Sequence, residues 1–497
     1  MGKLLYFHVK TFKFKMLCFK LSEKQKIYKN FIAFNVCFIL IFASFDVVAM
    51  IASVLNQDGS LGNGSQAIIY ATQFFTGLVW PQVIIELIGF KFTLMLAETC
   101  YLLFLIANTF PSWGTLVPGS LLAGFANSLA WTTMGIYFTI LSKKYAKINN
   151  IAFVNGQTLL FGIFGFIFFF NYILGSTWIG TILDIKEQPL NSTFNYAESC
   201  GINNCPLTPL PEATSKPTVS SVYKLCATIN GACFLSIIIA FLFVDDLKYD
   251  ENLNPIERGN VSLKKIGNKF KDEFKSLFEL SKCLNIWLLM PIAIFLGYEL
   301  TILWFEYHRS FVSCLTDVNY IGWTSIVYGC TASLFSLILG KVLKHMGLQT
   351  AMVMMLMGAL INSVFMISWT PSKDGSYVIF IMAIAFAFTN CIATAQVRAV
   401  FGIFFPANTS AYSAMNIFET IGLVTGSVIS VYFCTYVKIY GYIIISVLGI
   451  FTYVYLEIRT KDKTNNQIVD NQNEKNKQNS ENSTKVVYME SNETIYF

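Results

Sequence analysis

Residues 32–54 read IAFNVCFILIFASFDVVAMIASV, an apolar stretch that holds one charged side chain, Asp46. A helix needs about 20 apolar residues to cross the hydrocarbon core of a bilayer. Stretches of this kind recur along the 497 residues, of which 55% are hydrophobic and only 13% charged. Soluble domains carry about 25% charged residues. The sequence therefore predicts an all-α, polytopic membrane protein, and it argues against a soluble enzyme, a secreted disulfide scaffold and a nucleic-acid binder.

The apolar stretches predict twelve transmembrane helices. Each must be a helix, because lipid offers no hydrogen bonds to an open backbone. The expected spans are 32–54, 66–88, 91–110, 114–141, 153–183, 219–244, 285–307, 320–343, 348–369, 376–402, 410–435 and 437–458. The predicted organisation is a basic N-terminal segment, a six-helix half, a linker, a second six-helix half and a disordered tail, at 1–31, 32–244, 245–284, 285–458 and 459–497.

The basic residues predict the orientation of the spans. With the N-terminus inside, all but six of the 35 Lys and Arg belong to segments assigned to the cytoplasm. This asymmetry follows the positive-inside rule. Both termini are therefore expected in the cytoplasm, and residues 184–218 are expected outside. No cleavable signal peptide is visible in residues 1–31. We expect a multi-pass protein of the plasma membrane or an endomembrane, with the lipid bilayer as its first partner.

The linker contains apolar residues at helical spacing with lysines between them. They are Leu263, Ile266, Phe270, Phe274, Leu277 and Phe278. This pattern predicts an amphipathic helix lying on the membrane surface. A solvated linker helix is the alternative.

Two loops with similar sequences, one in each half of the chain, indicate a degenerate internal repeat. The loop after the second span reads ELIGFK from Glu86, and the loop after the eighth reads GKVLKHMG from Gly340. They occupy the same place in each half, and parallel six-span repeats are the architecture of the major facilitator superfamily. The loops are similar to that superfamily's signature loop but lack its Asp-Arg pair, so the salt-bridge gate that the pair builds is expected to be weakened.

Several separated motifs, in one order from about residue 31 to 458, resemble the uncoordinated-93 family, the ion-channel-regulatory branch of that superfamily. They include SWGTL from Ser112, AWTT from Ala130, STWIG from Ser176, CGINNCP from Cys200, SFVSC from Ser310 and FETIG from Phe418. The resemblance implies the major facilitator fold. It also implies a regulatory role, since members are known as a regulatory subunit of a two-pore-domain potassium channel or as escorts of Toll-like receptors.

Charged residues inside spans are costly and indicate functional sites by default. The candidates are Asp46, Glu98, Glu299, Arg398 and Glu419. Arg398 and Glu419 lie on consecutive antiparallel spans at depths that differ by roughly 7 Å at 1.5 Å rise per residue. A structural ion pair is the favoured interpretation, and a transport site is the alternative. Asp46 and Glu299 occupy equivalent spans of the two halves, so they are candidates to bind a proton or cation, or to sit solvated at a cavity mouth.

Three cysteines and two asparagines are expected on the outer face. Cys200 and Cys205 are close enough in sequence to form a local disulfide, which is the favoured pairing, while a bond from either to Cys314 is the rival. Asn191 heads a glycosylation triplet in the long outer loop, and Asn63 heads another in a short one.

No phosphate-binding loop, nucleophile elbow or zinc-protease motif appears, and no Cys/His spacing fits a metal site. We therefore expect neither catalysis nor a cofactor. The potassium-filter run TVGYG is absent too, so the chain is not expected to be a potassium pore itself. The leading hypothesis is an accessory subunit of a potassium channel. The alternatives are a secondary transporter of a small solute, with proton coupling through Asp46 or Glu299 as a candidate mechanism, and a trafficking escort for membrane receptors.

Overall fold

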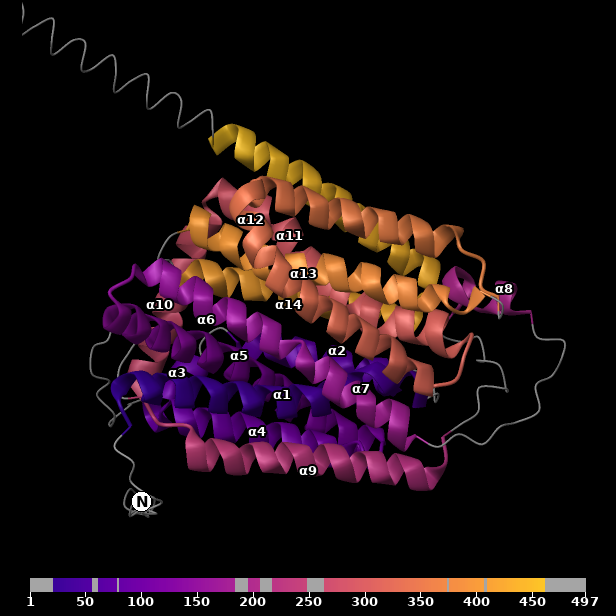
Figure 1. Cartoon of the computed structure of the whole chain (residues 1–497), viewed down its shortest axis with the longest axis horizontal. Coiled ribbons are helices and arrows are strands. Elements are labelled where there is room, and N and C mark those ends of the chain that lie inside the picture. Colours follow the sequence, from indigo (N-terminus) through magenta and orange to yellow (C-terminus); the bar gives the residue numbers. More distant parts are fainter. Residues whose placement is uncertain are drawn as a thin grey trace, which may run out of the picture.

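The computed structural model describes residues 21–55, 61–77, 80–183, 195–205, 217–247, 263–372, 375–405 and 409–460. Within these ranges the chain folds into long helices that form one bundle (Figure 1). In this described part of the chain, ten helices are long and apolar enough to cross a membrane, or up to eleven if one bent pair counts as a span. The expectations for residues 1–20, for Asn191 and for the tail beyond residue 460 lie outside the described residues.

Eight long helices precede the linker, and we call them the N-terminal group. They are α1 (Glu23–Leu55), α2 (Leu61–Thr76), α3 (Trp80–Ile88), α4 (Phe90–Ala107), α5 (Trp113–Asn149), α6 (Phe153–Phe168), α7 (Phe170–Ile182) and α9 (Val219–Phe243). Between α7 and α9 lie the short α8 (Tyr196–Ser199) and a turn of 3-10 helix, η1 (Gly201–Asn203).

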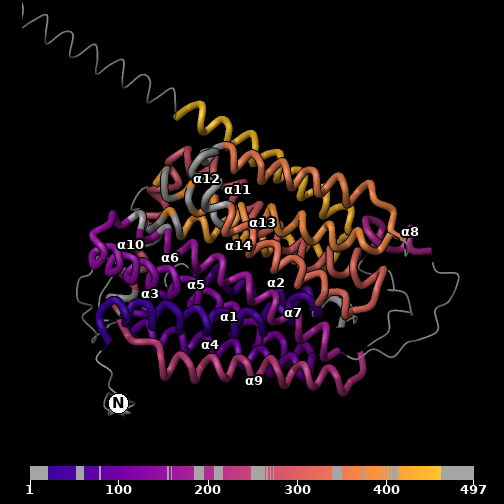
Figure 2. The backbone as a smooth tube through the Cα atoms, in the orientation of Figure 1, coloured from indigo at the N-terminus to yellow at the C-terminus, as the bar shows by residue number. Residues whose placement is uncertain are grey.

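The linker contributes α10 (Leu263–Ser281). The helices after it, which we call the C-terminal group, are α11 (Leu284–Thr301), its π-helical continuation η2 (Ile302–Ser313), α12 (Asn319–Ser368), α13 (Val378–Phe404), α14 (Thr409–Tyr432) and a last helix, Thr435–Thr460. In Figure 2 the indigo-to-magenta helices of the N-terminal group lie on one side and the orange-to-yellow helices on the other. We name the two ends of the bundle after α8 and α10, which lie at opposite ends of it (Figure 1).

Helix α12 runs over the eighth and ninth predicted spans, and α6 and α7 divide the fifth. Two predicted spans are not among the ten helices. The second is broken, because α2 and α3 meet at an angle of 70°. The fourth, 114–141, coincides with α5, a helix of 37 residues that is not among the ten. Gly, Ser, Thr and Asn interrupt its apolar residues, and Asn127, Ser128 and Thr133 are buried inside the bundle. The count of twelve spans and their division into two halves stay predictions.

Local sequence explains where two of the helices begin. Ser112 caps α5 with a capping box, in which its hydroxyl accepts from the Thr115 amide and the Thr115 hydroxyl accepts from the Ser112 amide. This satisfies donors that a helix N-terminus otherwise leaves free. Gly89 precedes α4 with φ of 86°, a conformation that favours glycine. The tight turn after α3 therefore depends on this residue.

Glycines set the closest helix contact in the C-terminal group. A methyl group added to Gly297 on α11 would collide with the Glu419 carbonyl oxygen on α14, and one added to Gly422 would collide with the Ile294 carbonyl oxygen. The two backbones thus touch without side chains between them, as small residues permit in membrane bundles. Between the two groups, α7 packs along α12 and α2 along α14.

We expect Gly297→Ala and Gly422→Ala to lower the free energy of unfolding by roughly 1–3 kcal/mol, because overpacking forces the helices apart. The matched control is Gly231→Ala on α9, where an added methyl group meets nothing within 4 Å. Thermal unfolding in detergent, followed by size-exclusion chromatography, measures the difference. Equal stability of all three variants would contradict the close contact.

Candidate functional site

A buried ion pair lies at the α8 end of the bundle. The Lys438 Nζ is 2.6 Å from Glu306 Oε1, and both side chains are 3% exposed. Glu306 comes from η2, and Lys438 from the first turn of the last helix. Removing one partner of such a pair costs about 3–5 kcal/mol, because the other charge is left buried alone. This contact therefore fixes how two helices of the C-terminal group meet.

Hydroxyl groups complete the surroundings of the Glu306 carboxylate. Ser430 donates to Oε1 at 2.8 Å, and Thr435 donates to Oε2 at 3.0 Å. The Ser310 hydroxyl lies 2.8 Å from that of Thr435. Both carboxylate oxygens thus have partners, which a buried charge requires. A π-helix is rare and often marks a functional site, and η2 brings Glu306 and Ser310 into this cluster.

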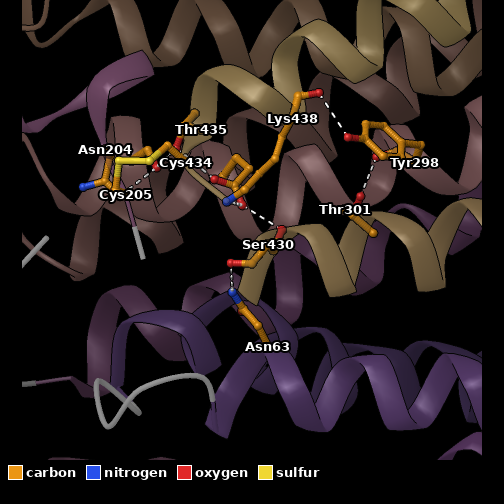
Figure 3. A network of polar contacts seen from close by, with 11 residues as sticks. Asn63, Asn204, Cys205, Tyr298, Thr301, Ser430, Cys434, Thr435 and Lys438 are labelled. Carbon is orange, nitrogen blue, oxygen red and sulfur yellow. Dashed lines mark hydrogen bonds and ion pairs between the residues drawn. A yellow bond between two sulfur atoms is a disulfide. The ribbon is translucent and has the colours of Figure 1, made fainter. Parts of the chain in front are cut away.

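The same cluster reaches the N-terminal group. The Asn63 side-chain amide on α2 donates to the Ser430 carbonyl oxygen on α14 at 3.4 Å (Figure 3). The prediction that Asn63 is a glycosylation acceptor in an outer loop is therefore wrong. The helix α2 begins at Leu61, earlier than predicted, and it buries Asn63 against α14 at 5% exposure.

The predicted disulfide between Cys200 and Cys205 is also wrong. Cys200 is bonded to Cys314 after η2, and Cys205 is bonded to Cys434 between α14 and the last helix. The turn η1 separates the two thiols and directs them to different helix ends. The segment 195–205, which follows the first five predicted spans, is thereby tied covalently to the C-terminal group. The rival pairing of Cys200 with Cys314 is the one that the structure shows.

The two carboxylates expected at a central cavity are both buried and bound to neutral partners. The Asn171 amide on α7 donates to Asp46 on α1 at 2.8 Å. Glu299 on α11 accepts hydrogen bonds from Thr389 on α13 and from the Tyr442 hydroxyl. Buried carboxylates tend to be paired, or to neutralise by taking up a proton. These two therefore differ from Glu306, whose charge has a cationic partner.

Polar atoms without a hydrogen-bond partner accompany these carboxylates. They include both amide atoms of Gln66, the Tyr70 hydroxyl, the Asn171 Oδ1 and the Glu299 Oε2. Gln66 and Tyr70 lie one turn apart on α2, which packs against α1. A few unpaired buried groups occur in native proteins and call for an explanation. Here they lie on α2, α7 and α11, so both groups of helices contain such atoms.

The remaining charged candidates bind helices together. Glu98 on α4 accepts from the Ser236 hydroxyl on α9 at 2.7 Å. The Arg398 guanidinium on α13 lies 3.6 Å from the Glu419 carboxylate on α14, with its side chain 32% exposed. A partly exposed pair at this distance contributes little to stability. No cluster of three or more His, Cys, Asp or Glu suited to a metal exists in the described part of the chain.

Sequence reasoning missed Lys438 and Cys434. In the predicted set of spans, Lys438 lies at the start of 437–458 and Cys434 at the end of 410–435. A usable signal exists, because Glu306 lies at the end of the span 285–307, on the same side of the membrane as the start of 437–458 in the predicted orientation. A charged side chain is costly to bury alone in a membrane, so an acid and a base at the same depth are expected to pair.

The fold and the charged, hydrogen-bonded interior define a multi-pass membrane protein with the fold of major facilitator transporters. The nucleoside transporter NupG aligns over 85% of this chain and 98% of its own, with a TM-score of 0.53 at 13% identity. The xylose transporter XylE from E. coli, in a partially occluded inward open conformation, aligns over 87% and 97%, with a TM-score of 0.56 at 11% identity. These likenesses show the fold alone.

Residues 56–454 match the family described as ion channel regulatory protein UNC-93, and the chain belongs to this family. Protein unc-93 homolog A of Xenopus laevis is 27% identical over 87% of this chain and 94% of its own length. A Caenorhabditis elegans relative, provisionally named a potassium channel regulatory protein, unc-93, is 24% identical over 81% of this chain and 57% of its own.

Lys438→Met should destabilise the protein by about 3–5 kcal/mol, because Glu306 is left buried without a cation. The double variant Lys438→Met/Glu306→Gln should recover much of that loss. Lys26→Met serves as the control, because Lys26 forms an exposed pair with Glu23 and its loss should change nothing measurable. Thermal unfolding of the four proteins gives the comparison, and a double variant as unstable as the single one would argue against the ion pair.

Mass spectrometry of unreduced protein should recover peptides that link Cys200 to Cys314 and Cys205 to Cys434. Cys434→Ser should abolish the second link and keep the first. Cys330→Ser, which removes an exposed free cysteine, should leave both in place. A peptide linking Cys200 to Cys205 would contradict the observed pairing.

Proposed function

We propose that this chain is a membrane-embedded regulatory subunit of a potassium channel. The observation that carries the proposal is the family match, which covers 399 residues from 56 to 454. The name of the Caenorhabditis elegans relative supports potassium as the ion. In this proposal, the partner is a membrane protein, and the chain neither conducts ions nor catalyses a reaction.

The fold supports a regulator that acts through its membrane-facing helices. The helix α9 lies at the edge of the bundle and exposes Phe234, Ile238 and Phe241 (Figure 1). Such a surface contacts either lipid or the helices of another membrane protein. A subunit that binds one channel state more tightly than another shifts the population toward that state by its differential affinity. The ion pair and the two disulfides hold the regulator's own helices in register for such binding.

We further propose that the α10 end of the bundle faces the cytoplasm, with both chain termini there. The disulfides at the α8 end support this orientation, because disulfides persist in oxidising compartments. The distribution of Lys and Arg supports the same orientation. In this arrangement twelve spans form two halves, with α5 as the most polar span.

The decisive experiment is voltage clamp of oocytes that express a two-pore-domain potassium channel with and without this chain. We expect the channel current to change at unchanged surface abundance, and we expect no current from this chain alone. The inactive control is the same chain with Cys200→Ser and Cys205→Ser, which frees segment 195–205. A current change explained entirely by surface abundance would favour a trafficking escort, and no effect on the channel would refute the proposal.

Secondary transport of a small solute is the second candidate. The observation that favours it is the pair of buried carboxylates, Asp46 and Glu299, bound to neutral partners within a transporter fold. Each is a candidate to take up a proton during transport. The unpaired amide of Gln66 and the hydroxyl of Tyr70 would suit a polar solute.

Proteoliposomes with an imposed proton gradient test this candidate across a panel of sugars, nucleosides and amino acids. Asp46→Asn and Glu299→Gln should each abolish gradient-driven uptake if the chain is a transporter. Glu98→Gln is the matched control, because Glu98 is equally buried and also has a neutral partner, Ser236, but lies on α4, outside the two equivalent spans of Asp46 and Glu299. Absence of uptake for the whole panel would remove the candidate.

A further inference from the structure

Helix α10 packs on the bundle along one edge and leaves two large apolar side chains uncovered. Its Phe270 ring lies 6.0 Å from the Trp80 ring, at the bend between α2 and α3, and its Leu280 is buried. Phe274 and Phe278, one turn apart, are 57% and 65% exposed. Adjacent exposed aromatic side chains on a helix indicate a contact with something apolar outside the described chain.

Among the exposed side chains of α10 that the structure describes, the apolar, cationic and acidic ones occupy successive sectors around the helix axis. Successive residues are rotated by about 100° around the helix axis. Going around the axis from the edge that faces the protein, Phe274 and Phe278 come first, and a row of exposed lysines follows at about 60–100° from Phe274. The row consists of Lys264, Lys271 and Lys275 on the helix and Lys282 immediately after it. The Lys282 ammonium lies 5.0 Å from the Phe278 ring centre, which places the cations beside the apolar edge. The exposed acids Asp272 and Glu279 lie farther around, beyond the lysines.

Two tryptophans place α10 at the depth of a membrane–water boundary. Trp287, in the first turn of α11, donates from its indole nitrogen to the Ser281 carbonyl at the end of α10, at 2.7 Å. Trp287 is 47% exposed, and Trp80, which contacts Phe270 in the middle of α10, is 42% exposed. Tryptophan is enriched where the hydrocarbon core meets the headgroups.

We propose that α10 is a binding surface for anionic lipids of the adjacent leaflet. Phe274 and Phe278 enter the acyl boundary, the four lysines contact the headgroup phosphates and carboxylates, and the acids face water. The order of apolar, cationic and acidic sectors matches the order of a bilayer surface from core to solvent. The inference does not rest on channel regulation and holds for a regulator or a transporter.

Lipid binding at α10 would act on both groups of helices. The helix contacts Trp80 of the N-terminal group and packs against α11 and α14 of the C-terminal group. An occupied α10 would therefore favour the arrangement seen here, in which these contacts exist together. The lipid composition of the membrane would then influence which arrangement of the two helix groups is populated.

Hydrogen–deuterium exchange of the full chain in nanodiscs tests the proposal. The discs contain phosphatidylcholine alone or mixed with rising fractions of phosphatidylserine. We expect the amides of residues 263–281 to become protected as phosphatidylserine rises, and added salt to reverse the protection, since ions screen surface charge. Each Lys→Gln substitution among the four should weaken lipid association about fivefold, and Phe274→Ser with Phe278→Ser should remove protection.

The control is Asp272→Asn with Glu279→Gln, which changes the same helix on its water-facing side and should leave protection intact or raise it. Thermal unfolding of every variant in neutral discs checks that the bundle is folded. A variant with all four Lys→Gln substitutions should lose the protection; if it does not fold, Lys275→Gln alone and the salt titration give the same readout. Equal exchange in neutral and anionic discs would overturn the proposal. So would protection by soluble inorganic phosphate in neutral discs, which would assign the site to a free anion.

Discussion

The buried pair of Glu306 and Lys438 imposes the strictest constraint on this bundle. Two opposite charges lie away from water, so each is tolerable only while the other is within reach. That condition fixes η2 against the last helix and brings Ser430, Thr435 and Ser310 into place around the carboxylate. Through the Ser430 carbonyl, the same cluster touches Asn63. The buried ion pair thus determines how the helices pack at the α8 end of the bundle.

The rest of the bundle is held by close backbone contacts and packed aromatic rings. Close backbone contact at Gly297 and Gly422 joins α11 to α14, and aromatic rings fill the N-terminal group, where Trp131 contacts Phe42 and Phe168. Among the polar groups near Asp46 and Glu299, the Gln66 amide, the Tyr70 hydroxyl and Glu299 Oε2 have no hydrogen-bond partner. Close packing therefore fixes the helix contacts, while these polar groups keep hydrogen-bonding capacity that the described side chains do not use.

Hydropathy alone was sufficient to predict the helical membrane class and most span positions, because lipid forces long apolar helices. The predicted fourth span coincides with α5, whose polar residues are buried within the bundle although they keep the helix out of the most apolar set. Hydropathy did not predict the break between α2 and α3. The candidate site was harder, since Lys438 meets Glu306 and Cys205 meets Cys434 across long stretches of chain. Contacts between residues so far apart in sequence depend on tertiary packing, which a local sequence pattern does not predict.

The disulfide framework has a consequence for how the chain behaves once it is cut. Both bonds join a cysteine before the linker to one after it, with sequence separations of 114 and 229 residues. A single peptide-bond break anywhere between residues 247 and 263 would therefore yield two fragments that remain one covalent molecule. Such a nicked protein would migrate as intact until a reductant reached the α8 end. The two fragments would stay together in the membrane, because the disulfides still join them although the peptide chain is broken.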